Sequence, residues 1–350
     1  MRMARRKRAT IREVAEATGL SPAAVSYALR GVQTSGETQA RVRDAAAALG
    51  YEADPIARAL AGGRSGLVGV LCGSLEDLGE QRFVEAVGRQ LRTRELHVLI
   101  TDAGGDPALE RKLARQLGDR RLDGLIVSPL DPSHPFWTEL ADALPVVTVG
   151  DALAGAATVG ELLYDNRAGV SAALHHLHAL GHRRVAVLTP SRPTTPNRPA
   201  ELVVAEVSAA LGLDTQIHNS PHSVEGATAV ASRVLAGASR PTALFCLSDA
   251  VACGVYAAAR DQGLRIPGEL SVAGYDDHPI ARCLTPELTS VSWGPSSVAR
   301  TAADVLADAI AGETAPRRIS VAPTLLPRDS TGRLARARPR RAEAAASAAR

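Results

Sequence analysis

Apolar residues follow two different periods along this 350-residue chain. Near the N-terminus they recur every third or fourth position in short segments, which is the period of an amphipathic helix. From residue 66 onwards, continuous runs of Val, Leu and Ile alternate with longer helical patterns. This change predicts a small all-α domain followed by an α/β body with parallel sheets.

The first helical segments predict two short helices joined by a tight turn. Thr10 and Glu13 have the spacing of a capping box, which opens the first helix. Gly19 permits the turn, and Ser21 N-caps a second helix with Pro22 at its first position. The apolar face predicted for the first helix consists of Ile11, Val14, Ala15 and Ala17.

The second helix has two distinct faces, and a third helix follows it. Val25, Ala28 and Leu29 are predicted to point inward. The opposite face carries Pro22, Ala23, Ser26 and Tyr27. A second capping box, Thr34 to Glu37, predicts a third helix that ends at Leu49. This arrangement is typical of a helix-turn-helix that lays its second helix in the DNA major groove, although a generic helical bundle is the alternative.

A short helical pattern links the two parts of the chain. Asp54 can cap a helix that begins at Pro55 and ends before the glycine pair at 62–63. So short a helix is marginal in water, and we expect it to order only when another element packs against it. A plain interdomain linker is the alternative interpretation, and the two are compatible.

The body is predicted to contain two similar βα sets. Strands are expected at residues 67–72, 97–101, 123–129, 145–150, 184–189, 215–218, 242–248 and 270–277. Helices are expected at residues 80–94, 107–119, 135–142, 168–180, 200–211, 223–236, 249–262 and 296–311. Two such sets imply two subdomains, and ligands of open parallel sheets bind beyond the strand C-termini, here in the cleft between them.

The net charge of +3 conceals a strong asymmetry along the chain. Residues 1–65 carry 11 Lys/Arg and 6 Asp/Glu, whereas residues 66–330 carry 23 and 30. Residues 331–350 carry 6 Arg and 1 Glu and are predicted to be a disordered basic tail. A basic end on an acidic body is typical of a polyanion binder with a separate module. The tail either adds nonspecific attraction to DNA or is inert.

Other function classes find little support in the sequence. The four cysteines form no CxxC pair, and no apolar run is long enough to cross a membrane, so a cytoplasmic protein without metal or cofactor is expected. His178 and His182 have a metal-like spacing, but structural roles for His176 and His182 are the preferred interpretation. No catalytic motif was found, and we expect no enzyme.

Several blocks of the body resemble the LacI/GalR (lactose-repressor-like) family of bacterial transcription regulators. They are DGLIVSP, YDNRAG, HLHALGHRRVAVL, LTPELTSV and the long block from PTALFCLSDA to VAGYDD. The resemblance implies a helix-turn-helix headpiece at 1–53, a hinge helix at 54–65 and a body at 66–330 made of two Rossmann-like subdomains of the periplasmic-binding-protein type I. The first subdomain would comprise 66–166 and 296–323, and the second 167–293 and 324–330.

The resemblance also implies which residues contact DNA. Pro22, Ala23 and Tyr27 would face base edges, and Leu60 beside Ala61 would wedge into the minor groove. Asp54 stands where the family usually has asparagine, so we expect it to cap rather than to contact phosphate. Phosphate contacts are expected from Thr10, Ser21, Ser26, Ser35 and Thr38.

Effector-site positions follow in the same way. Those implied to touch a ligand are Ser74, Asp77, Gly79, Ser128, Asp165, Ser248 and Asp276. Gly79 and Glu80 stand where the family often has two aromatics, and Ala200 where it has an arginine; Arg198 could substitute. A pocket based on aromatic stacking is therefore not expected.

Together these features predict a homodimeric repressor that binds double-stranded operator DNA under the control of a small-molecule effector. A transporter's solute-binding protein, an enzyme that uses the cleft, and a family member that has lost its effector response are the alternatives. A solute-binding protein would leave the basic N-terminal segment without a role.

Overall fold

The computed structural model describes residues 9–29, 31–51, 64–191, 195, 199–313 and 315–334. The chain forms two compact units, Met1–Gly66 and Leu67–Arg350. Three predicted features lie outside the described residues. They are the hinge segment with Leu60 and Ala61, the tail from residue 335, and Arg198. The prediction that the disordered tail begins at residue 331 was wrong, because residues 331–334 are described and the N–H of Leu334 donates to the carbonyl of Leu180 at 3.0 Å.

The N-terminal unit is built from three helices around a small core. They are α1 (Ile11–Thr18), α2 (Pro22–Leu29) and α3 (Gly36–Leu49). The core consists of Val14, Ala15, Val25, Ala28, Val42 and Ala46, with Ile11, Leu20 and Leu29 packed against it. The predicted inward face of α2 is confirmed, but Ala17 is exposed and Leu20 completes the core beyond α1 instead.

Two of the three predicted helix starts are confirmed. Thr10 and Glu13 form both bonds of the capping box, and the Ser21 hydroxyl accepts from the backbone N–H of Ala24 at 3.2 Å. The prediction of a Thr34 cap was wrong. Ser35 has the extended backbone of an N-cap and accepts from the N–H of Thr38, so α3 begins one residue later.

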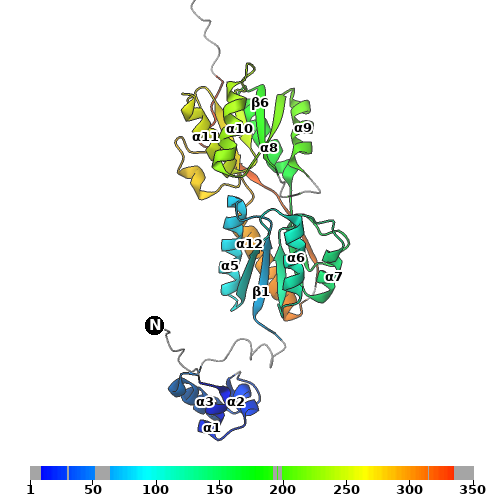
Figure 1. Ribbon diagram of the computed structural model, residues 1–350, viewed down its shortest axis with the longest axis vertical. Coiled ribbons are helices and arrows are strands. Elements are labelled where there is room, and N and C mark those ends of the chain that lie inside the picture. The colour runs from blue at the N-terminus through cyan, green and yellow to red at the C-terminus, as the bar shows by residue number, and fades with distance from the viewer. Residues whose placement is uncertain are drawn as a thin grey trace, which may run out of the picture. The chain divides into compact units, whose positions relative to one another are not determined.

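The body contains two six-stranded sheets. The first has the order β11-β5-β4-β3-β1-β2, with every pair parallel. Its strands are β1 (Leu67–Cys72), β2 (His97–Asp102), β3 (Gly124–Val127), β4 (Val146–Gly150), β5 (Gly160–Tyr164) and β11 (Arg317–Val321). Its helices are α5 (Leu78–Arg92), α6 (Pro107–Gly118), α7 (Phe136–Ala143) and α12 (Pro295–Ala311). The core on one face draws on α5 and α12, and the core on the other draws on α6 and α7 (Figure 1).

The second sheet has the order β12-β10-β9-β8-β6-β7. Its strands are β6 (Arg184–Pro190), β7 (Asp214–Ser220), β8 (Ala243–Cys246), β9 (Ser271–Tyr275), β10 (Thr289–Ser292) and β12 (Thr324–Leu326). Its helices are α8 (Asn166–Ala179), α9 (Ala200–Leu211), α10 (Val224–Ala236) and α11 (Asp249–Asp261), and a 3-10 turn, η1 (Pro279–Arg282), follows β9. Two cores, one with α8 and α9 and one with α10 and α11, cover its faces.

The structure extends and corrects the predicted body. Every predicted strand and helix is present within a few residues, but β5, β10, β11 and β12 were missed. The second sheet is also not wholly parallel, because β12 runs antiparallel to β10. The chain returns to the first sheet through α12, which packs beside α5, and β11 pairs with β5 before β12 joins the second sheet.

The histidines on and just after α8 take part in packing. His176 lies 2.8 Å from the hydroxyl of Thr331, and His182 lies 2.9 Å from each of the hydroxyls of Thr242 and Ser271. Burial lowers the pKa of both imidazoles, which favours their neutral forms. Within the described chain, no helix is long and apolar enough to cross a bilayer.

Candidate functional site

A cavity of about 410 Å³ lies in the body, where the C-terminal ends of both sheets meet. Residues that follow β1, β3 and β5 line it from the first sheet, and residues that follow β6, β8 and β9 line it from the second. This is where open parallel sheets bind ligands, and the volume suits a small molecule.

Five of the predicted effector residues line this cavity together. They are Ser74, Asp77, Gly79, Ser128 and Asp276. Asp77 is fixed because its Oδ1 caps α5, accepting from the N–H groups of Gly79 at 2.7 Å and Glu80 at 3.2 Å. Its other oxygen lies 3.8 Å from Nδ1 of His222, which comes from the second sheet's side of the cavity.

Two other predicted residues are helix caps outside the cavity lining. Asp165 accepts from the N–H of Ala168 at the start of α8, and Ser248 accepts from the N–H of Ala250 at the start of α11. Ser248 is buried, and burial together with the nearby Asp77 raises the pKa of Asp276, an effect that Ser248 opposes. Ser248 therefore positions a cavity residue instead of facing the cavity.

Glu80, which was not predicted as a site residue, brings a second carboxyl to the first sheet's wall. Burial and the nearby Asp77 raise its pKa to about 8, while hydrogen bonds from Ser128 and from the backbone of Gly73 and Ser74 act in the opposite direction. Its Oε1 has no hydrogen-bond partner.

Asp276 meets the start of α5 across the cavity. A Cβ at Gly79 would lie only 2.9 Å from Cγ of Asp276 and 3.1 Å from Oδ1 of Asp77. Glycine at this position therefore permits the two carboxyls to approach. The Nε1 of Trp293 donates to Oδ1 of Asp276 at 3.2 Å.

The cavity has aromatic walls, contrary to expectation. Tyr164, Tyr275, Phe83 and Trp293 all line it, and the rings of Tyr164 and Trp293 are 4.9 Å apart. They come from the ends of β5, β9 and β10 and from α5. The absence of aromatics at positions 79 and 80 gave no information about these other segments. Trp293 is one of only two tryptophans in the sequence, and this rarity was the feature that could have indicated an aromatic residue at the site.

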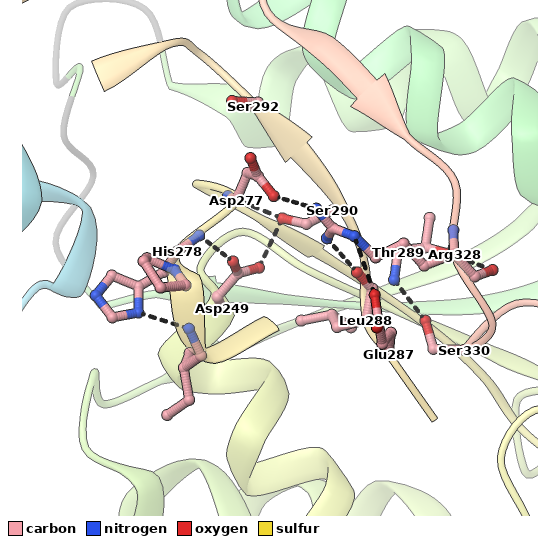
Figure 2. Close-up of polar contacts among 12 residues, drawn as sticks. Asp249, Asp277, His278, Glu287, Leu288, Thr289, Ser290, Ser292, Arg328 and Ser330 are labelled. Atoms are coloured by element: carbon pink, nitrogen blue, oxygen red, sulfur yellow. Dashed lines mark hydrogen bonds and ion pairs between the residues drawn. The ribbon is translucent and has the colours of Figure 1, made fainter. Parts of the chain in front are cut away.

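A polar network holds the turn that presents Asp276 (Figure 2). Asp276 and Asp277 have positive φ angles of 104° and 49°, which are costly for residues with a side chain. The hydroxyl of Ser290 accepts from the N–H of Asp277 at 3.0 Å and donates to Asp249 at 2.7 Å. Arg328 pairs with the Asp277 carboxylate and donates to the carbonyl of Leu288 at 2.6 Å. Burial raises the pKa of Asp249 to about 7.

The N-terminal unit presents the predicted DNA-reading face on α2. Pro22, Ala23 and Tyr27 are exposed, while Ser26 is partly buried. Ser21 and Ser35 are exposed N-caps, and Thr38 is partly buried. The hydroxyl of Thr10 donates to Glu13 at 3.1 Å, so its proton is already engaged.

Comparison with known proteins finds relatives among transcriptional repressors with a periplasmic-binding-protein-like domain. Residues 174–331 match the model of a periplasmic binding protein-like domain. The chain is 28% identical to the ribose operon repressor of Haemophilus influenzae, over 92% of this chain and 98% of that protein. It is 29% identical to the HTH-type transcriptional repressor PurR of Escherichia fergusonii, over 92% and 96%.

Solved structures share the fold over nearly the whole chain. The lac repressor dimer bound to operator and the anti-inducer ONPF matches with a TM-score of 0.79 at 23% identity, covering 93% of this chain and 100% of that one. The CelR–cellobiose complex matches with a TM-score of 0.66 at 25% identity, covering 92% and 100%. Fold and site define a helix-turn-helix protein with a periplasmic-binding-protein-like body. By these comparisons the chain is similar to LacI-family repressors over nearly its whole length.

Proposed function

We propose that this protein is a sequence-specific DNA-binding transcription regulator, a repressor, whose operator affinity is set by a small molecule in the cavity. The observation that carries the proposal is the combination, in one chain, of a helix-turn-helix with an exposed α2 face and a cavity at the ends of two sheets. Its relatives among the repressors support the same conclusion.

DNA recognition is assigned to α2 and to the hinge segment. Pro22 and Ala23 have no polar side-chain atoms and would contact thymine methyl groups, whereas Tyr27 can donate one hydrogen bond to a base edge. Leu60, beside Ala61, would wedge into a minor-groove step and bend the duplex. Phosphate contacts would come from Ser21, Ser26, Ser35, Thr38 and the backbone amides near Thr10.

The effector would bind between the two sheets of the body. Ser74, Asp77, Gly79, Ser128 and Asp276 would face it, with Asp165 and Ser248 fixing the helices behind them. Arg198 remains a predicted contact. Ligand binding would change how the subdomains close on each other and so change whether two hinge helices of a homodimer can form on DNA. Effector and operator then alter each other's affinity by the same factor.

The experiment that tests this function is operator mapping. Chromatin immunoprecipitation with sequencing and in vitro selection from a random duplex library should return one shared, two-fold symmetric motif, because a dimer reads two half-sites. The purified full-length protein should then bind that motif at least about a thousandfold more tightly than random duplex. Equal affinity for both at moderate salt would overturn the proposal.

A further inference from the structure

Among the described residues that line the cavity, the charged groups have one sign. Of the described residues that line it, Glu76, Asp77, Glu80, Glu201 and Asp276 are acidic, and none is Lys or Arg. His222 is the one lining side chain in that set that can gain a positive charge, and it lies 3.8 Å from Asp77. A ligand that carries a positive charge would complement these carboxyl groups and favour their ionised forms.

Three of these carboxyls keep an oxygen without a partner. Asp276 is only 9% exposed, and its Oδ2 has no hydrogen bond, although Trp293 donates to Oδ1. Glu80 Oε1 and Glu201 Oε2 are also unpaired, while Glu201 Oε1 accepts from the Thr189 hydroxyl at 2.7 Å. Buried polar atoms in proteins are almost always paired, so these acceptors indicate missing donors in the cavity.

Aromatic rings complete the same cavity. Tyr164, Tyr275, Phe83 and Trp293 line it, and Trp293 lies 4.9 Å from Tyr164 and 6.0 Å from Phe83 by ring centroids. The faces of such rings attract a cation as well as apolar groups. Carboxylates beside an aromatic wall form the surroundings that an organic ammonium ion prefers.

We infer that the cavity takes a small organic cation, a ligand whose protonated amine lies against Asp77, Glu80 and Asp276 and whose carbon frame packs on the aromatic rings. This inference rests on the proposed role of the cavity as the effector site. A metal ion is a poorer occupant, because no group of three or more His, Cys, Asp or Glu in the described parts of the chain has the geometry to hold one. An amine supplies up to three donors together with the missing charge.

The test is calorimetric titration of the full-length protein, without DNA, against matched pairs of probes. Each pair consists of an amine and its neutral analogue: glucosamine with glucose, galactosamine with galactose, and 1,4-diaminobutane with 1,4-butanediol. At least one amine should bind about tenfold or more tightly than its analogue. A neutral analogue that binds as well as its amine, or no binding by any amine at millimolar concentration, would overturn the inference.

Two variants test the assigned carboxyls. Glu80→Gln and Asp276→Asn keep the side-chain shape, and each should reduce the difference in affinity between the amine and its neutral analogue by about tenfold. The melting temperature of the ligand-free protein should be held or raised, because a neutral amide replaces a carboxyl whose ionised form is disfavoured by burial. Glu225→Gln, an exposed residue on α10, is the matched control and should bind as the parent does. An undiminished amine preference in both cavity variants would contradict the assignment. Because DNA is absent, failure here leaves the operator test unaffected, and failure of the operator test leaves this result standing.

Discussion

The guanidinium of Arg82 donates a hydrogen bond to the backbone carbonyl of Asp277. Arg82 lies on α5, which covers the first sheet, and Asp277 lies in the strained turn after β9 of the second. The contact therefore joins the two halves of the body beside the cavity. The same turn is fixed from behind by Arg328 and Ser290, so the position of Asp276 depends on both halves.

Replacing Arg82 by alanine should loosen this junction. The loss of a hydrogen bond from a charged donor is worth about 1.5–3 kcal/mol, so amine affinity should fall by roughly tenfold or more. The backbone amides of Glu80 and Asp277 should also exchange faster, measured by hydrogen–deuterium exchange with mass spectrometry. Arg89→Ala is the control, because Arg89 on the same helix forms an exposed pair with Glu85. Unchanged amide hydrogen exchange in the Arg82 variant would mean that this hydrogen bond does not stabilise the contact between the two halves of the body.

Two glycines of α5 allow the cavity contact to be separated from helix propensity. Gly88→Ala should raise the free energy of unfolding by up to about 1 kcal/mol, because alanine favours a helix and the nearest atom to its Cβ is the flexible end of Arg92. Gly79→Ala should lose amine binding, because the new methyl would displace Asp276 from Asp77. Chemical denaturation and calorimetry on both variants measure the two effects. Amine binding by the Gly79 variant at parental affinity would contradict the close approach of the two carboxyls.

Amine binding should depend on pH through Glu80. Burial and the nearby Asp77 raise its pKa to about 8, so the empty cavity holds this carboxyl largely protonated at neutral pH. A bound cation favours the ionised form, so binding should release protons and affinity should rise as pH increases from about 6 to about 8. Asp77, Asp276, Tyr164 and Cys72 surround the group, and His222 faces Asp77, so the titration belongs to the cluster.

Titrations in two buffers of different ionisation enthalpy measure this proton release directly. Glu80→Gln should release fewer protons than the parent protein, because the titrating group is removed. Affinity that does not change across this pH range would be inconsistent with a cation bound at Glu80.

The sequence predicted the elements whose signals are local. The start of α2 followed from Ser21 and Pro22, and β1 was predicted at its residues because its Val and Leu run is buried on both faces. The four missed strands have weaker patterns. β12 has only three residues, and β11 lies at the edge of its sheet with mostly exposed side chains.

Adjacent residues of similar propensity also limit prediction. Thr34 and Ser35 are both good N-caps, and only the backbone angles identify Ser35 as the cap. The cavity lining was also only partly predictable from the sequence. Asp276 and Gly79 were predicted individually, but Trp293 and Tyr164 come from other strand ends, and only the fold brings them to the same cavity. Such long-range placement has no signature within one short segment.

The final prediction concerns Tyr27, the polar residue proposed to read a base edge. Its side chain is 38% exposed on α2, beside Pro22 and Ala23, which have no polar side-chain atoms. Tyr27→Phe keeps the ring and removes one donor, so affinity for the selected operator should fall by about 0.5–1.5 kcal/mol, while binding to random duplex stays the same. Fluorescence anisotropy with both duplexes at fixed salt measures the two affinities. Glu16→Gln, an exposed change on α1, serves as the control for the headpiece. If the Tyr27 variant kept full operator preference, base reading would have to be reassigned to shape and methyl contacts alone.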